Sequence, residues 1–128
     1  MIRSESAVTA DVLIRASKLG IRLFRNNSGA VMVDGRNIRF GLGNISEKLN
    51  KSLKSSDLIG IQPVLIKPEH VGNTFGIFVS LEMKHGGWRL QPGDMRAQAQ
   101  LKWIELIRSC GGIGGFVSDV SELEGVLL

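Results

Sequence analysis

Apolar residues at helical spacing predict two helices. The first helix begins near Ser4 or Ser6, whose hydroxyl can cap its first turn, and ends at Gly20. The second begins near Pro92 and Asp94 and continues to about Cys110, before two glycines. The apolar stripe of the first helix is Val8, Val12, Ala16 and Leu19, and that of the second is Met95, Ala99, Trp103 and Ile107.

Runs of β-branched and apolar residues predict six strands. These are Ile21–Asn26, Val31–Val33, Arg36–Phe40, Asp57–Ile66, Thr74–Lys84 and Ile113–Val117. Asp34-Gly35 predicts a type I′ hairpin turn, in which both central residues have positive φ. The stretch from Gly41 to Ser56 is polar and basic, which predicts an exposed loop with room for one helical turn. The run from Thr74 to Lys84 is apolar throughout most of its length, as in a central strand covered on both faces.

The predicted order of elements is αβββ, a basic loop, then ββαβ, and Asp119 can cap a final helical turn. This order indicates an α/β fold with a mixed β-sheet core flanked by helices. The chain has 128 residues, of which 43% are apolar and 22% charged. That length and composition suit a single domain over residues 1–128.

Composition and charge narrow the class of protein. The formal net charge is +4, although three of the 12 acidic residues lie in the last ten positions, so the remainder is more basic. A basic surface favours an anionic partner such as nucleic acid, but it also serves solubility. Cys110 is the single cysteine, which excludes an internal disulfide and indicates a reducing, cytoplasmic location. No stretch has the roughly 20 apolar residues of a membrane helix, and no signal peptide is expected.

The apolar strand that ends in Glu82-Met83-Lys84 carries the candidate chemistry. Side chains at i and i+2 of a strand share one face, roughly 6 to 7 Å apart, so Glu82 and Lys84 project together. Asp57 opens another apolar strand. If the two strands are neighbours, Asp57 and Glu82 can converge on a divalent cation such as Mg²⁺.

Two carboxylates and a lysine are the residues that metal-assisted phosphodiester hydrolysis requires. The ammonium of Lys84 would orient the attacking water or stabilise the negative charge that develops on the phosphate. Glu5 can add a third carboxylate from the first helix, although a residue near a helix N-terminus has a dipole-based reason to be acidic. Gln100, near the apolar stripe of the second helix, can reach the same pocket and hold the water or the lysine.

Basic and aromatic residues outside this set are candidates for contact with nucleic acid, with a solvated surface as the alternative. Trp88 can stack on an unpaired base, whereas Trp103 lies on the apolar stripe and is expected in the core. Asn26 and Asn27 are further candidates, with turn formation as the alternative. The basic candidates are Arg36, Arg39, Lys48, Lys51, Lys54 and Arg89.

The ordered set of motifs resembles the virus-type replication and repair nuclease (VRR-NUC) domain of the PD-(D/E)XK nuclease superfamily, in its stand-alone form. The resemblance extends from Glu5 to about Val120. The matching stretches are Glu5, Arg25–Gly29, Arg39–Gly41, Ser56–Gly60, Glu82–Lys84, Gln100 with Trp103, and Gly111–Gly112. Ser56 stands where the superfamily often has proline.

The resemblance implies a restriction-endonuclease-like fold and a Mg²⁺- or Mn²⁺-dependent, structure-selective DNA endonuclease for branched DNA such as Holliday junctions or flaps. Asp57 and Glu82 would be metal ligands together with the main-chain carbonyl of Met83. Lys84 would be the catalytic lysine, with Glu5 and Gln100 in support. Stand-alone members of the family tend to be homodimers, which suits two symmetric cuts.

Less specific interpretations remain open at this point. Glu82 and Lys84 can form an exposed ion pair at a strand end, Asp57 can cap a turn, and Gln100 can be a solvated helix residue. The chain can accordingly be a catalytically silent DNA-binding module of the same fold. It can also be a restriction-type nuclease, although its small size leaves no room for a recognition domain.

Overall fold

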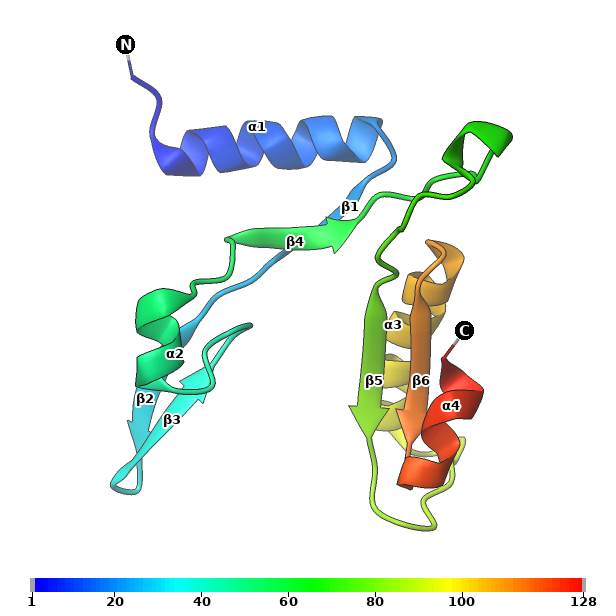
Figure 1. Ribbon diagram of the computed structural model, residues 1–128. Coiled ribbons are helices and arrows are strands. Elements are labelled where there is room, and N and C mark those ends of the chain that lie inside the picture. Colours follow the sequence, from blue (N-terminus) through cyan, green and yellow to red (C-terminus); the bar gives the residue numbers. More distant parts are fainter. Residues whose placement is uncertain (1, 128) are drawn as a thin grey trace. The chain divides into compact units, whose positions relative to one another are not determined.

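The computed structural model describes residues 2–127 and consists of two compact units (Figure 1). The first unit extends to Gly60 and the second begins at Ile61. Helices and strands occur in both, which confirms the mixed α/β class. The described strands form three two-stranded sheets and not the single mixed sheet that we expected.

The first unit contains two helices and three strands, together with a fourth strand whose last residue, Ile61, is assigned to the second unit. They are α1 (Glu5–Lys18), β1 (Arg22–Arg25), β2 (Gly29–Val33), β3 (Arg36–Phe40), α2 (Glu47–Ser52) and β4 (Leu58–Ile61). The Ser4 hydroxyl caps α1 by accepting a hydrogen bond from the amide of Ala7 at 3.2 Å. Gly20, with φ of 78°, follows the helix end. Both predicted boundaries of the first helix are therefore confirmed.

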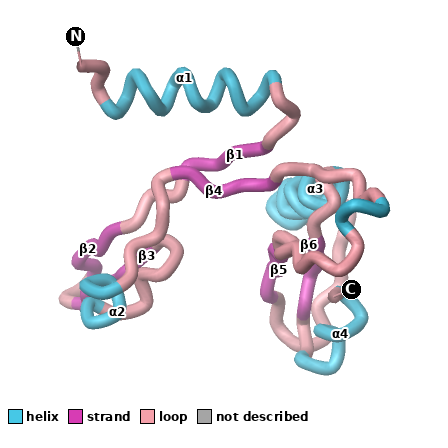
Figure 2. Tube along the Cα trace, turned by 45° about the horizontal axis from the view of Figure 1, so that its top comes forward, coloured by secondary structure: helices cyan, strands magenta, loops and turns pink. Residues whose placement is uncertain are grey.

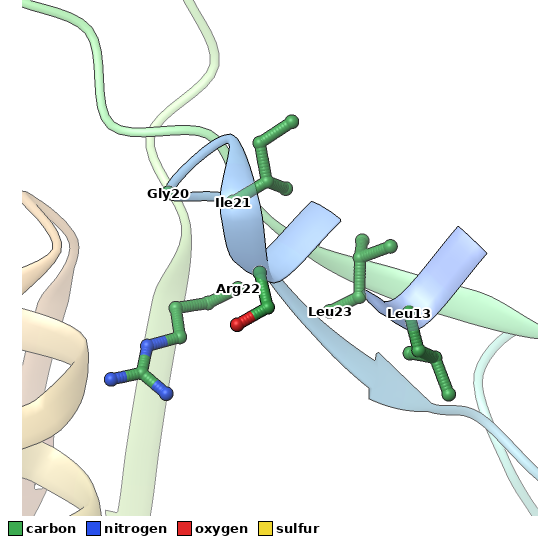
Figure 3. A pocket seen from close by; sticks show the side chains of 6 residues that line it. Leu13, Gly20, Ile21, Arg22 and Leu23 are labelled. Atoms are coloured by element: carbon green, nitrogen blue, oxygen red, sulfur yellow. The ribbon is translucent and has the colours of Figure 1, made fainter. Parts of the chain in front are cut away.

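The buried face of α1 differs from the predicted stripe. Val8, Val12 and Leu19 are exposed, and of the four only Ala16 is buried. Thr9 and Leu13 are half-buried beside Ala16, so the face toward the unit follows positions 9, 13 and 16. Figure 3 shows Leu13 of α1 near Leu23 of β1, where a hollow of about 400 Å³ remains between helix and strand. Glu5 is exposed and does not point toward a core.

The predicted β2–β3 hairpin is confirmed with its turn. Asp34 and Gly35 have φ of 49° and 75°, as a type I′ turn requires. The strands pair antiparallel from Gly29 opposite Phe40 to Val33 opposite Arg36. The stretch after the hairpin contains a complete short helix, α2, which Ser46 caps and which lies next to the hairpin in Figure 2.

β1 and β4 form the second two-stranded sheet of this unit, and the backbones of Arg22 and Gly60 are in close contact. The amide of Asn26 donates to the carbonyl of Asp57 at 2.8 Å, whereas Arg22 lies beside Gly60, so the two strands run in opposite directions. A Cβ atom at Gly60 would lie 1.8 Å from the carbonyl oxygen of Arg22. Glycine is therefore required at this position of β4.

The second unit is built on a pair of parallel strands. Its elements are β5 (Val79–Met83), α3 (Met95–Ser109), β6 (Ile113–Val117) and α4 (Leu123–Val126), with single 3-10 turns at Pro68–His70 and Val120–Glu122. Asp94 caps α3 by accepting from the amide of Ala97 at 3.0 Å, and Asp119 caps the turn at Val120–Glu122. The last strand has its predicted bounds, α3 begins near Asp94 as expected, and the Asp119 cap is confirmed.

Glycines on β6 let helices approach both faces of this sheet. A Cβ at Gly114 would lie 3.0 Å from the Ile104 side chain of α3, and one at Gly115 would lie 2.9 Å from Val126 of α4. Adjacent residues of a strand point to opposite faces, so α3 covers one face and α4 the other, beside β6 in Figure 1. α4 is only four residues long, and Val79 and Met83 of β5 remain exposed on its face. The expectation that β5 is a central, fully covered strand is therefore wrong.

The buried face of α3 is also rotated from the predicted one. Ala97, Ile104 and Ile107 are buried, whereas Met95 is 75% and Trp103 38% exposed. The stripe that packs on the sheet thus follows positions 97, 100, 104 and 107. This register brings Gln100 onto the side of α3 that faces the strands.

Candidate functional site

Gln100 bridges the two ionisable side chains at the end of β5. Its Nε2 donates to Glu82 Oε1 at 2.9 Å, and its Oε1 accepts from Lys84 Nζ at 2.8 Å. All three side chains are half-buried. No ion pair joins Glu82 and Lys84 within the described residues, so the exposed ion pair considered above is not what holds them.

The geometry of the strand explains why these residues meet. Even-numbered positions of β5 face α3: Ser80 accepts from Trp103 Nε1 at 2.8 Å, and Glu82 and Lys84 contact Gln100. Gln100 and Trp103 are three residues apart and therefore neighbours on the helix surface. Side-chain hydrogen bonds thus join the even-numbered positions from Ser80 to Lys84 to the middle of α3 along one face.

Two aromatic rings surround the ammonium of Lys84. Its Nζ lies 4.9 Å from the centroid of Trp88 and 5.7 Å from that of Phe116, both within the range of cation–π attraction. The two rings are in contact with each other, with centroids 4.7 Å apart. Phe116 is opposite Glu82 in the parallel register, so β6 places it on the same face. Lys84 is therefore held by an amide oxygen and two ring faces.

The backbone of β5 presents the carbonyl of Met83 away from β6. The Phe78 carbonyl accepts from Ile113, and the Lys84 amide donates to Val117, so even-numbered positions bond to β6. Odd-numbered positions of a parallel strand then direct their N–H and C=O groups to its other edge. That edge carries no strand partner within the described residues. Among the described residues, no strand therefore bonds to the Met83 carbonyl.

Asp57 lines a polar hollow of about 380 Å³ in the first unit. Its carboxylate has no hydrogen bond or ion pair to the residues that the structure describes. The amide and hydroxyl side chains around it come from α2 and from the loops that precede β2, α2 and β4. The lining residues are Ser28, Gly29, Ala30, Arg39, Asn44, Asn50, Lys54, Ser55 and Asp57.

Asn26 fixes the backbone next to Asp57. Its Nδ2 donates to Ser55 Oγ at 2.8 Å and to the Ser56 carbonyl at 2.9 Å, and its Oδ1 accepts from the Leu42 amide. Both amide hydrogens are used, so the side chain keeps no donor for a phosphate. The structure therefore gives Asn26 a structural position, in contrast to the DNA contact that we expected.

The other candidates for nucleic-acid contact differ in their surroundings. Trp88 and Arg39 are half-buried and held by neighbours, whereas Lys51 forms an exposed pair with Glu47 at 3.5 Å. Lys54 Nζ donates to Asn50 Oδ1 at 2.7 Å. The remaining candidates are exposed; they are Asn27, Arg36, Lys48 and Arg89.

The donor atoms suit a hard divalent cation in their chemistry. Asp57 and Glu82 offer carboxylate oxygens and Met83 offers a carbonyl, which are the ligand types that Mg²⁺ prefers. Asp57 belongs to the first unit and Glu82 to the second, and their convergence stays a prediction. Among the described residues, no three His, Cys, Asp or Glu side chains gather as a metal-binding group. Glu5 stands at the start of α1 and does not line the hollow that contains Asp57.

Two residues that sequence reasoning missed contribute to these arrangements. Asn44 is 4% exposed and accepts from Arg39, although it lies in a stretch that reads as an exposed loop. Phe116 contacts Trp88 and Lys84, but only the pairing of β5 with β6 shows that it is beside Glu82. Neither residue carries a local signal of its role.

Comparisons with family models, with curated proteins and with solved structures give no match to this chain. Within residues 2–127, no helix has the length and apolar character needed to cross a membrane.

Proposed function

We propose that this chain is a divalent-metal-dependent deoxyribonuclease with a restriction-endonuclease-like fold of the VRR-NUC type. The single observation that supports it best is the bridge that Gln100 makes between Glu82 and Lys84. A carboxylate and an ammonium held side by side by a neutral amide suit phosphodiester hydrolysis, because their charges stay available to a substrate.

The residues around Lys84 give it a defined role in this proposal. Its ammonium has three donors, of which one is used by Gln100, so two remain for a water or a phosphate oxygen. The ring faces of Trp88 and Phe116 restrict the ammonium without neutralising it. Lys84 would therefore orient the attacking water or stabilise the charge that develops on the phosphate.

Asp57, Glu82 and the Met83 carbonyl would hold Mg²⁺ or Mn²⁺, with Glu5 as a supporting carboxylate. When bound, the cation would supply Lewis acidity toward the scissile phosphate. Glu82 has one carboxylate oxygen that accepts from Gln100, which fixes the orientation of the other. In metalloproteins, hydrogen bonds from residues that do not touch the metal commonly orient the metal ligands in this way.

The substrate class in this proposal is branched DNA, and the acting form is a homodimer. The basic charge of the chain supports a polyanionic substrate.

A cleavage assay tests this function directly. Labelled linear, flapped and four-way DNA is incubated with Mg²⁺, Mn²⁺ or EDTA, and products are separated on a denaturing gel. We expect cutting of the branched substrates with either metal and none in EDTA.

Glu82→Gln and Lys84→Ala should abolish cutting but keep DNA affinity, because they remove only the chemical step. Lys102→Ala, an exposed lysine on α3, is the matched control. Cleavage by both site variants at the wild-type rate would refute the assignment.

The second candidate function is a DNA-binding module without cleavage. The same bridge favours it, because Gln100 also attaches α3 to β5 and so gives Glu82 and Lys84 a structural reason to be present. This candidate predicts DNA binding with no cutting under any metal condition. It further predicts that Gln100→Ala lowers thermal stability.

A further inference from the structure

The polar hollow of the first unit contains an arginine, Arg39, that forms no ion pair with the residues that the structure describes. Arg39 is half-buried there, and the ion pairs of the described residues are Arg3 with Asp11 and Lys51 with Glu47. The hollow measures about 380 Å³, which is within the usual range for ligand sites. A guanidinium that forms no ion pair, in a hollow whose lining charges sum to a positive value, is suited to an anionic ligand.

Asn44 fixes the guanidinium of Arg39. Its Oδ1 accepts from Arg39 Nε at 3.1 Å and from Nη2 at 2.7 Å. A guanidinium has five N–H donors, so three remain for a ligand. Two or more parallel donors in a planar fork match the oxygens of a phosphate better than a flexible ammonium does.

The position of Asn44 is itself fixed by the hairpin. Its Nδ2 donates to the carbonyls of Gly29 and Phe40, both at 2.8 Å, at the open end of the β2–β3 pair. Asn44 is 4% exposed, and its amide is fully bonded. Arg39 is therefore held before any ligand arrives, which lowers the entropic cost of binding.

The charges that line the hollow favour a singly charged anion. Arg39 and Lys54 contribute two positive charges and Asp57 one negative charge. Lys54 uses one donor on Asn50 and keeps two. A phosphodiester carries one negative charge and matches this balance, whereas a phosphate monoester would bring a second charge near the carboxylate of Asp57.

We infer that Arg39, positioned by Asn44, binds one backbone phosphodiester of a nucleic-acid strand in this hollow, with Lys54 as the second cation. The identity of the polymer as DNA rests on the proposed function. The site itself rests on the hydrogen bonds of Arg39 and Asn44 and on the lining charges. A phosphate bound at this site would lie in the same hollow as Asp57.

Equilibrium binding tests this site without cleavage. Fluorescence anisotropy of a labelled DNA duplex is measured in EDTA at several salt concentrations. We expect Arg39→Gln to weaken binding and to reduce the slope of log affinity against log salt by about 0.9, as loss of one phosphate contact does. Arg39→Lys should keep most of the slope but bind less tightly, because the charge remains and the fork is lost. Arg15→Gln makes the same charge change on an exposed part of α1 and should leave the slope unchanged.

Asn44→Ala is the second variant, with circular dichroism to confirm that it folds. It should weaken DNA binding in the wild-type protein and have little further effect in Arg39→Gln, because both changes disable the same donor. An unchanged salt slope in Arg39→Gln would overturn the proposal. So would displacement of DNA by inorganic phosphate or a nucleoside monophosphate at concentrations similar to the DNA phosphate itself, since that would assign the hollow to a free phosphate.

The salt dependence of DNA binding tests the phosphate site whether or not the protein is a nuclease. A reduced slope in a protein that never cuts DNA would retain the phosphate site and refute the nuclease. Cutting that depends on Glu82 and Lys84, together with an unchanged slope in Arg39→Gln, would retain the nuclease and refute the phosphate site.

Discussion

At the scale of single residues, Trp88 has two possible roles that kinetics can separate. Its ring lies 4.9 Å from Lys84 Nζ and packs on Phe116, which makes it a positioning residue for the ammonium. The sequence alone suggested a stacking surface for an unpaired base instead. A positioning role affects the chemical step, whereas a stacking role affects DNA binding.

We predict that Trp88→Leu lowers kcat for DNA cleavage about fivefold to tenfold and leaves KM nearly unchanged. This size corresponds to about 1 kcal/mol, typical of a half-buried cation–π contact. Trp88→Phe should restore most of the rate, because a ring face remains over Lys84. Steady-state kinetics on a flapped substrate gives both constants. A raised KM with an unaltered kcat would instead assign Trp88 to base stacking.

The candidate site shows how far sequence reasoning reaches at this scale. Glu82 and Lys84 on one face follow from the period of a strand alone, and the structure has them there. Asn26 was expected to contact DNA, but its amide is occupied by Ser55, Ser56 and Leu42, which are distant in sequence. Contacts of this kind depend on which loops meet, and no local pattern encodes that.

At the scale of elements, the types and caps were predictable, whereas the buried faces were not. The helix starts at Ser4 and Asp94, the type I′ turn and the last strand all follow from local chemistry. The predicted stripe of α3 placed Trp103 in the core, yet Ala97, Ile104 and Ile107 are the buried residues. Glycines at 112 and 114 let the small and β-branched side of α3 approach the sheet, which periodicity within the helix cannot reveal.

Gly60 provides a test of the β1–β4 pair. We predict that Gly60→Ala destabilises the protein by more than about 2 kcal/mol, because its Cβ would overlap the Arg22 carbonyl, a backbone atom that cannot turn aside. Gly76→Ala is the matched control, since its Cβ would meet open space. The control should change stability by less than about 1 kcal/mol. Urea unfolding followed by circular dichroism measures both, and equal stability of the two variants would contradict this packing.

The C-terminal turn and α4 should depend on pH. Hydrogen bonds from the Ser121 side chain and amide lower the pKa of Asp119, and those from the Ser118 side chain and amide lower the pKa of Glu122. A lowered pKa in the folded state means that these bonds stabilise the turn above the usual carboxyl pKa. That stabilisation is lost as the pH falls through the folded-state values.

We therefore expect residues 118–126 to lose protection from amide hydrogen exchange below about pH 4, before the rest of the second unit. Asp119→Asn combined with Glu122→Gln should remove this pH dependence, because neither side chain then titrates. Hydrogen exchange with mass spectrometry gives the profile. Protection that stays constant from pH 6 to acid in the wild-type protein would contradict the role of these carboxylates.

Across the molecule, the strands leave more apolar side chains exposed to solvent than the sequence pattern predicts. The β2–β3 hairpin has exposed apolar residues on both faces, and Met32 is 68% exposed. A two-stranded hairpin is marginal in water unless its apolar side chains are covered. The choice between one mixed sheet and three pairs depends on contacts between distant strands, which is why the sequence pattern did not reveal it.

A homodimer, part of the proposed function, would cover such surface. We predict a sedimentation mass of twice 13.9 kDa at micromolar concentration, with the hairpin at the interface. Met32→Glu should shift the protein to the monomer, because a charge on a buried interface costs several kcal/mol. Met95→Glu introduces the same charge at an exposed methionine of α3 and should leave the mass unchanged. Analytical ultracentrifugation over a hundredfold concentration range measures the mass of the wild-type protein and of both variants. A monomeric mass throughout would exclude the dimer, and a dimer retained in Met32→Glu would exclude the hairpin as its interface.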